Sequence, residues 1–200
     1  MAVNTVIKNI ISNCCLGGAL YRDYYKKFHN PFIWSVLLPN DVITIIKEYD
    51  NINFNNYEIL PSNILNLNDI FKVRIDNKID LHFVHYRNSK NDINGRKHIF
   101  DLFINDSKKY VETKYKNRLA RMIENNQKPI FVICDNKAGY ELSLDIINEI
   151  NKIETNYEII IVSKKDLSNI KFRKNITWIK FDGNLHNEVS KNFGKKILKL

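Results

Sequence analysis

The stretch KPIFVICD, from Lys128 to Asp135, decides the fold class of this sequence. It is apolar almost without interruption, which is typical of a strand buried on both faces of a sheet. A helical stretch follows at about Tyr140 to Ile153, and a second apolar strand, YEIIIVS, runs from Tyr157 to Ser163. Strands that alternate with helices in this way predict a parallel sheet.

The same alternation extends toward both ends of the chain. We expect a second helix to begin beside Asn40 or Asp41, either of which has the side chain of a helix cap. Further expected elements are a strand at Thr5–Ser12, a helix at Leu16–Phe28, an extended stretch at Pro31–Leu38, a hairpin at Phe71–Arg87 turning at Asp76-Asn77-Lys78, a helix at Lys97–Asn125 that is either continuous or broken near Asp106-Ser107, a strand at Ile176–Asp182 and a helix at Asn187–Leu198. We therefore predict an α/β fold, a single three-layer domain over residues 1–200 with a mostly parallel sheet covered by helices on both faces.

Composition restricts the function classes. The chain has 200 residues and a formal charge of +9, but its lysines are scattered and no stripe of arginines and aromatics stands out, so we predict no specific nucleic-acid partner. No apolar run reaches the ~18 residues that cross a bilayer. The N-terminal MAVNTVIKNIISNCC reads as a strand rather than a signal peptide, which predicts a cytoplasmic protein without a transmembrane segment. The oligomeric state is not indicated.

The cysteines are Cys14, Cys15 and Cys134, an odd number that includes two sequence neighbours. This pattern favours reduced thiols over a disulfide framework. Cys134 lies inside an apolar strand and is expected in the core. Because the sequence contains no CxxC or CxxH spacing, we predict no metal site and no cofactor.

The stretch ISNCCLGGALY, Ile11 to Tyr21, lies where the first strand should give way to a helix. Ligands of open α/β sheets bind at such strand ends, and the N-terminus of a helix stabilises a thiolate. Cys15 is then either a buried packing residue or a nucleophile. A nucleophilic cysteine needs a base, and the strand DLHFVHYR offers His82 or His85 on opposite faces. Asp135 ends its strand at the same sheet edge if the strands are parallel, as a catalytic acid or as a helix cap.

The order of these motifs resembles a bacterial family of exopolysaccharide biosynthesis proteins and a related group of papain-like cysteine peptidases. The resemblance rests on ISNCCLGGALY, NPFIWS, HFVHY and YKNRLARM, between about Ile10 and Asp135. The first family opens with Ser-Asn-Asn-Cys, an aromatic and two glycines. Here Cys14 replaces an asparagine and Leu16 the aromatic, so the resemblance selects Cys15. The matched positions are Ser12, Asn13, Cys15, Gly17 and Gly18.

The papain-like group adds three further matches. Its Pro-Phe-Asp-Trp motif falls on Pro31 to Trp34, where Ile33 replaces the acid. Its histidine falls on His85, and its tyrosine with spaced arginines falls on Tyr115, Arg118 and Arg121, with Asn117 where another arginine is expected. In papain-like folds the histidine lies on an antiparallel strand, which the predicted parallel sheet does not provide.

Three functions follow. The first is a thiol-dependent hydrolase or acyltransferase of surface-polysaccharide metabolism, with Cys15 as nucleophile, His85 as base and Asp135 orienting the imidazole. The second is a transferase acting on a nucleotide-sugar or another phosphorylated glycan precursor, whose phosphate Gly17, Gly18 and the helix N-terminus bind. Arg118 and Arg121 share a helix face that either adds positive charge to this site or is simply solvated. The third is a noncatalytic glycan-pathway protein that binds through aromatics. The predicted substrate-binding residues are Asn13, Gly17, Gly18, Trp34, Arg118 and Arg121.

Overall fold

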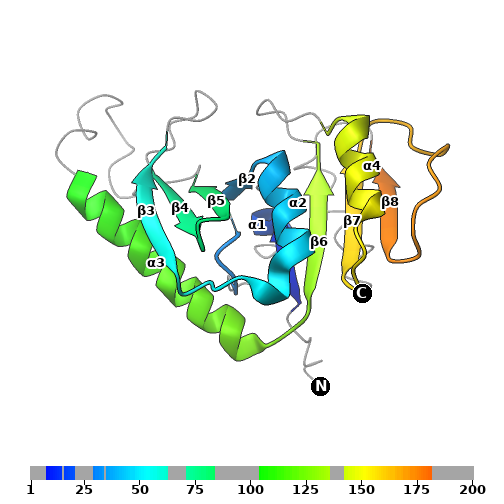
Figure 1. Ribbon diagram of the computed structural model, residues 1–200. Helices are drawn as coiled ribbons and strands as arrows, with labels where there is room; N and C mark the ends of the chain where they lie inside the picture. Colours follow the sequence, from blue (N-terminus) through cyan, green and yellow to red (C-terminus); the bar gives the residue numbers. More distant parts are fainter. Residues whose placement is uncertain are drawn as a thin grey trace, which may run out of the picture.

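The strands form two separate sheets (Figure 1). The computed structural model describes residues 8–14, 16–20, 29–33, 35–62, 71–83, 104–135 and 142–181, and every statement below concerns these ranges. The first sheet is wholly parallel and has the strand order β1-β6-β7-β8. Its strands are β1 (Asn9–Ser12), β6 (Pro129–Cys134), β7 (Glu158–Ser163) and β8 (Ile176–Lys180).

The second sheet is wholly antiparallel, in the order β2-β5-β4-β3. Its strands are β2 (Ser35–Leu37), β3 (Tyr57–Pro61), β4 (Phe71–Ile75) and β5 (Ile79–Phe83). The β4–β5 turn has positive φ at Asp76 (52°) and Asn77 (54°), a conformation that Asp and Asn tolerate well. The predicted hairpin is therefore confirmed.

Helices pack around these sheets. They are α1 (Leu16–Leu20), α2 (Pro39–Glu48) with the 3-10 turn η2 (Tyr49–Asn51), α3 (Ile104–Asn125) and α4 (Leu144–Lys152). The cap predicted for α2 is wrong: Leu38 is the N-cap, because Pro39 fits the first helical position without needing its missing N–H group. Asp41 instead uses its carboxylate to bind the N–H group of Asp80 in β5.

One hydrophobic core joins the two sheets. Ile11 and Phe131 of the parallel sheet belong to the same buried cluster as Val73 and Leu81 of the antiparallel sheet. The opposite face of the parallel sheet belongs to a second buried cluster, which includes α1. Members of that second cluster include Ile10, Leu16, Leu20, Val132 and Ile160. The parallel sheet is therefore buried on both faces, as its apolar strands predict.

The prediction of an α/β fold with a parallel sheet is confirmed, but a single mostly parallel sheet does not account for the four antiparallel strands. The three-layer arrangement and the single domain over residues 1–200 stay predictions. In the described part of the chain, no helix combines the length and apolar character needed to cross a membrane. The predicted helix at Asn187–Leu198 lies outside the described residues, as does the predicted Leu16–Phe28 helix beyond Leu20.

Candidate functional site

Asn13 joins the two sheets directly after β1 ends. Its side-chain Nδ2 donates to the carbonyl oxygen of Cys134 at 2.9 Å, and its Oδ1 accepts from the Cys134 N–H group at 2.9 Å. Its own carbonyl oxygen accepts from the Leu37 N–H group of β2 at 3.2 Å. The side chain thus continues the pairing with β6 while the main chain turns to the antiparallel sheet. Asn13 is buried, and as a substrate-binding residue it stays a prediction.

The NPFIWS stretch packs under β1 through a buried asparagine. Asn30 Nδ2 donates to the Ile10 carbonyl oxygen at 2.7 Å and to Asn9 Oδ1 at 3.0 Å, while Asn30 Oδ1 accepts from the Phe32 N–H group at 3.0 Å. Ser35 Oγ closes the turn by donating to the Phe32 carbonyl oxygen at 2.6 Å. These buried hydrogen bonds fix the position of the stretch against β1, because breaking them would leave buried polar groups without partners.

Arg118 connects α3 to the same stretch. Its Nη1 donates to the Ile33 carbonyl oxygen at 2.6 Å, and only 6% of the residue is exposed. Burial, with a further contribution from Arg121, lowers the pKa of Arg118 to about 10. Arg121 lies one turn further along α3, and its Nε is buried with no hydrogen-bond partner among the described residues.

The HFVHY stretch begins on β5, the strand beside β2. Phe83 pairs with Ser35, and His82 pairs with Val36. Pairing or buried hydrogen bonds therefore link the described parts of four stretches that are far apart in sequence: ISNCC, NPFIWS, HFVHY and YKNRLARM. Asn13 lies at the carboxyl end of β1, whereas Asn30 contacts the first two residues of this strand.

Asp135 lies at the carboxyl edge of the parallel sheet, as predicted from parallel strands, directly after β6. Its carboxylate accepts from the Leu142 N–H group at 2.9 Å, from the Lys164 N–H group at 3.2 Å and from Ser163 Oγ. These bonds hold the segments that follow β6 and β7. A catalytic role for Asp135 stays a prediction.

A disulfide joins Cys14 and Cys134, whose Cα atoms are 7.0 Å apart. The expectation of reduced thiols is therefore wrong for this pair. The reason is the parallel register of Ser12 with Val132, which places the residues two steps further along side by side although 120 residues separate them in sequence. Both are buried, and the expected core position of Cys134 is confirmed. Disulfides are typical of oxidising compartments, so this bond and the predicted cytoplasmic location disagree unless the pair is reduced there.

Gly17 allows α1 to approach β1 closely. A Cβ atom at this position would lie 3.1 Å from the Ser12 Cβ atom, so a larger residue would push the helix away from the strand. Gly17 and Gly18 are both buried, and a contact of either with phosphate stays a prediction. Three predicted site residues, Cys15, Trp34 and His85, lie outside the described residues.

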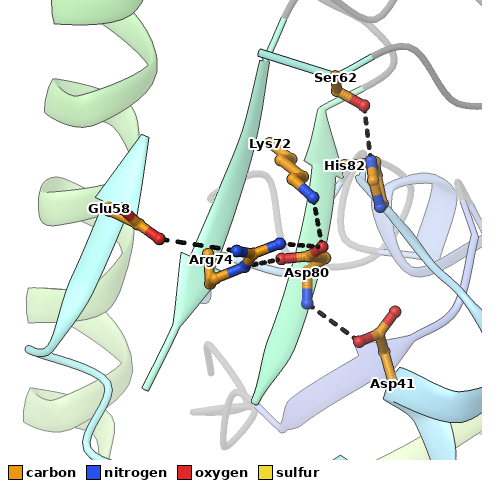
Figure 2. A network of polar contacts seen from close by, with 7 residues as sticks. All are labelled: Asp41, Glu58, Ser62, Lys72, Arg74, Asp80 and His82. Carbon is orange, nitrogen blue, oxygen red and sulfur yellow. Dashed lines mark hydrogen bonds and ion pairs between the residues drawn. The ribbon is translucent and has the colours of Figure 1, made fainter. Parts of the chain in front are cut away.

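A polar network lies on one face of the antiparallel sheet (Figure 2). This network was not predicted from the sequence. Asp80 on β5 accepts from Lys72 Nζ at 2.5 Å and from Arg74 Nε at 2.8 Å, and Arg74 Nη1 also lies 3.9 Å from Glu58 Oε1. Burial opposes ionisation of Asp80, but the bonds from Arg74 and Lys72 outweigh it and lower its pKa. Among the described residues no cation is in direct contact with Asp41, and burial raises its pKa to about 6.

His82 belongs to the same face of the sheet. Its Nδ1 lies 2.8 Å from Ser62 Oγ, and both side chains are buried (Figure 2). The sequence indicates this shared face through residue spacing: Lys72 and Arg74 are two residues apart, as are Asp80 and His82, and alternate residues of a strand lie on the same face. His82 is one of the two histidines that the sequence offers as a base, and in the structure its Nδ1 contacts Ser62.

The described residues contain no group of three or more His, Cys, Asp or Glu side chains that could hold a metal ion. Comparison with models of known protein families finds no match. Comparison with curated proteins finds no relative either. The case for a function therefore depends on the chain itself.

Proposed function

We propose that this protein is a thiol-dependent hydrolase or acyltransferase of bacterial surface-polysaccharide metabolism. One observation carries the proposal: four stretches that are scattered in sequence are linked beside β1. Asn13, Asn30 and Arg118 each make buried hydrogen bonds in this region, to Cys134, Ile10 and Ile33. Asn13 lies at the carboxyl edge of the parallel sheet, two residues before Cys15, and ligands of α/β folds typically bind at this edge.

In this proposal Cys15 attacks an ester, amide or thioester carbonyl. His85 takes the thiol proton and returns it to the leaving group, and water or an acceptor hydroxyl then releases the acyl group from sulfur. The antiparallel β5 supports this assignment, because the resemblance implies a catalytic histidine on an antiparallel strand, and the HFVHY stretch begins on β5. Asp135, at the carboxyl edge, is the residue proposed to orient the imidazole.

The nucleotide-sugar alternative has less support. Gly17 is occupied in helix–strand packing, and Arg118 already donates to a protein carbonyl group. The finer features of the fold belong to the same proposal: a three-layer domain, with α1 packed on the Ile10 face of the parallel sheet and α4 on the Phe131 face. A cytoplasmic location also stays part of it.

The proposal is tested by assaying Cys15→Ser against a panel of p-nitrophenyl esters and acyl thioesters. Loss of the nucleophile should lower the turnover of any accepted substrate by about a thousandfold or more. Asn40→Ala is the control, because Asn40 is exposed on α2 and has no role in the proposal, so this variant should keep the activity. A Cys15→Ser variant that turns over substrate like the wild type would contradict the proposal.

A further inference from the structure

Four cations form a basic cluster beside the C-terminal end of α4, namely Lys152, Lys171, Arg173 and Lys174. Lys152 is the last residue of that helix, and the other cations lie in the connection from β7 to β8, which Figure 1 shows in orange. The lysines of the cluster are exposed and Arg173 is half-buried. The cluster therefore depends on how this connection packs against the helix.

Asparagine side chains hold the connection in place. Asn151 Nδ2 donates to the Lys171 carbonyl oxygen at 3.1 Å, and Asn151 Oδ1 accepts from the Arg173 N–H group at 3.1 Å. Asn175 Nδ2 donates to the Thr155 carbonyl oxygen, just beyond the helix, at 3.1 Å. These bonds fix the backbone that carries the cations, so less conformational entropy is lost when a ligand binds to them.

Little negative charge balances the basic cluster. The segments 151–157 and 171–175 contain four cations and a single acid, Glu154, which leaves them a formal charge of +3. In the part of the chain that the structure describes, none of the four cations forms an ion pair. The negative end of the α4 dipole is equivalent to about half a unit charge and offsets only part of this excess. The cluster is therefore suited to an anionic ligand.

The position of the basic cluster indicates a long ligand. The cluster precedes β8, whereas Asp135 follows β6, so in this parallel sheet they lie at opposite edges. A ligand that reaches both edges must span about 17 Å, the length of a strand of five residues. A polymer chain meets this requirement and a single sugar does not.

The nearby aromatic residues favour a polyanion without bases. Phe172 in the connection and Trp178 on β8 are half-buried and pack against the core. Proteins that bind single-stranded nucleic acids instead present aromatic rings on which the bases stack. An acidic polysaccharide, which offers repeated carboxylates and no bases, fits the cluster better.

We propose that the basic cluster is a docking surface for an acidic polysaccharide, whose repeated carboxylates bind along it. This inference rests on the proposed function, because it names a polyanionic chain as the substrate of that enzyme. The exposed lysines attract the chain through charge, which salt screens beyond about 8 Å at physiological ionic strength. Binding is therefore weaker at high salt.

The test measures binding without turnover. Fluorescein-labelled alginate, a polymer of uronic acids, is titrated with the protein at low and at high sodium chloride and followed by fluorescence anisotropy, with labelled neutral dextran as the reference. We expect saturable binding of alginate that weakens at high salt, and no binding of dextran. The double variant Lys171→Gln/Lys174→Gln should weaken alginate binding by about tenfold or more. Asn151→Ala keeps the net charge but releases the connection, so it should weaken binding by about twofold or more.

The double variant Lys108→Gln/Lys109→Gln is the matched control. It removes the same charge from exposed positions on α3, which lies on the opposite side of the molecule from β8 (Figure 1), and should bind alginate like the wild type. Equal losses in the two double variants would overturn the docking surface, as would absence of alginate binding or tighter binding of duplex DNA than of alginate. Cys15→Ser should bind alginate like the wild type, so failure of the nucleophile and failure of the docking surface are distinguishable.

Discussion

The two sheets differ in what their faces contact. The parallel sheet is buried on both sides, with Phe131 in one cluster and Val132 in the other. The antiparallel sheet buries Val73 and Leu81 on one side and carries the Lys72–Asp80–Arg74 network on the other (Figure 2). Apolar packing therefore dominates the parallel sheet, whereas the antiparallel sheet combines apolar packing on one face with charge pairing on the other. Asn13 joins the two sheets through its hydrogen bonds to Cys134 and Leu37.

The largest effect should come from the shared core. Phe131 is fully buried, with its ring centroid 6.0 Å from that of Tyr49 and 5.6 Å from that of Tyr157. Phe131→Ala should lower the free energy of unfolding by about 3–5 kcal/mol, because it leaves a cavity. Glu58→Gln on the charged face should change it by less than about 1 kcal/mol. Urea denaturation measures both, and similar losses would contradict the contrast between the sheets.

The disulfide between Cys14 and Cys134 should give the next largest effect. It closes a long loop, with a sequence separation of 120, so its reduction should lower the free energy of unfolding by about 2–4 kcal/mol. Intact mass before and after reduction and alkylation tests whether the bond is present, with Cys15 as the thiol that stays free. A protein that takes up three alkyl groups without prior reduction would show that the bond is not formed.

Asn13 tests the connection between the sheets. Asn13→Ala removes both side-chain bonds to the Cys134 backbone and leaves a buried N–H and a buried C=O group unpaired. We expect a loss of about 2–3 kcal/mol in unfolding free energy. Asn40→Ala is the control, because Asn40 is exposed on α2. Equal effects of the two variants in urea denaturation would exclude the proposed joining role.

Asp41 gives the smallest effect, and it depends on pH. Because burial raises its pKa from 3.8 to about 6, the folded state holds this proton more tightly than the unfolded state. The resulting cost is absent well below the unfolded pKa of 3.8, grows between that pH and about 6, and is fully present above about 6. Asp41→Asn keeps the oxygen that accepts from the Asp80 N–H group but removes the charge. It should therefore stabilise the protein by about 1–3 kcal/mol at pH 7.

Little change is expected from Asp41→Asn at pH 3, where the wild-type side chain is mostly protonated in both the folded and the unfolded state. Melting curves of the two proteins at pH 3 and pH 7 measure the difference. Stabilisation of equal size at both pH values would mean that the effect is not electrostatic.

Local patterns predicted part of this fold. The apolar runs of β6 and β7 identified a parallel sheet, and the Asp76-Asn77 turn identified the β4–β5 hairpin. They did not identify a separate antiparallel sheet, because β2 has only three residues and its pairing with β5 joins segments far apart in sequence. Pairing between distant segments leaves no periodic signal in either one.

The sequence likewise predicted only part of the candidate site. A polar residue after a strand, such as Asn13, is read as a ligand for substrate, whereas its partner here is a backbone 121 residues away. Arg118 and Arg121 were correctly placed on one helix, but the spacing alone did not show that Arg118 is buried against Ile33. Asp135 was placed at the correct edge because that required only the direction of the strands.

The stretches linked beside β1 are proposed to serve a reactive Cys15. The most direct measurement is the rate of iodoacetamide alkylation of the native protein across a range of pH, with each cysteine mapped by peptide mass. We expect the rate of Cys15 alkylation to rise with pH and to reach its midpoint well below ~8.5, the pKa of a free thiol, while the buried Cys14 and Cys134 do not react. A Cys15 that is inert, or that titrates like a free thiol, would contradict it.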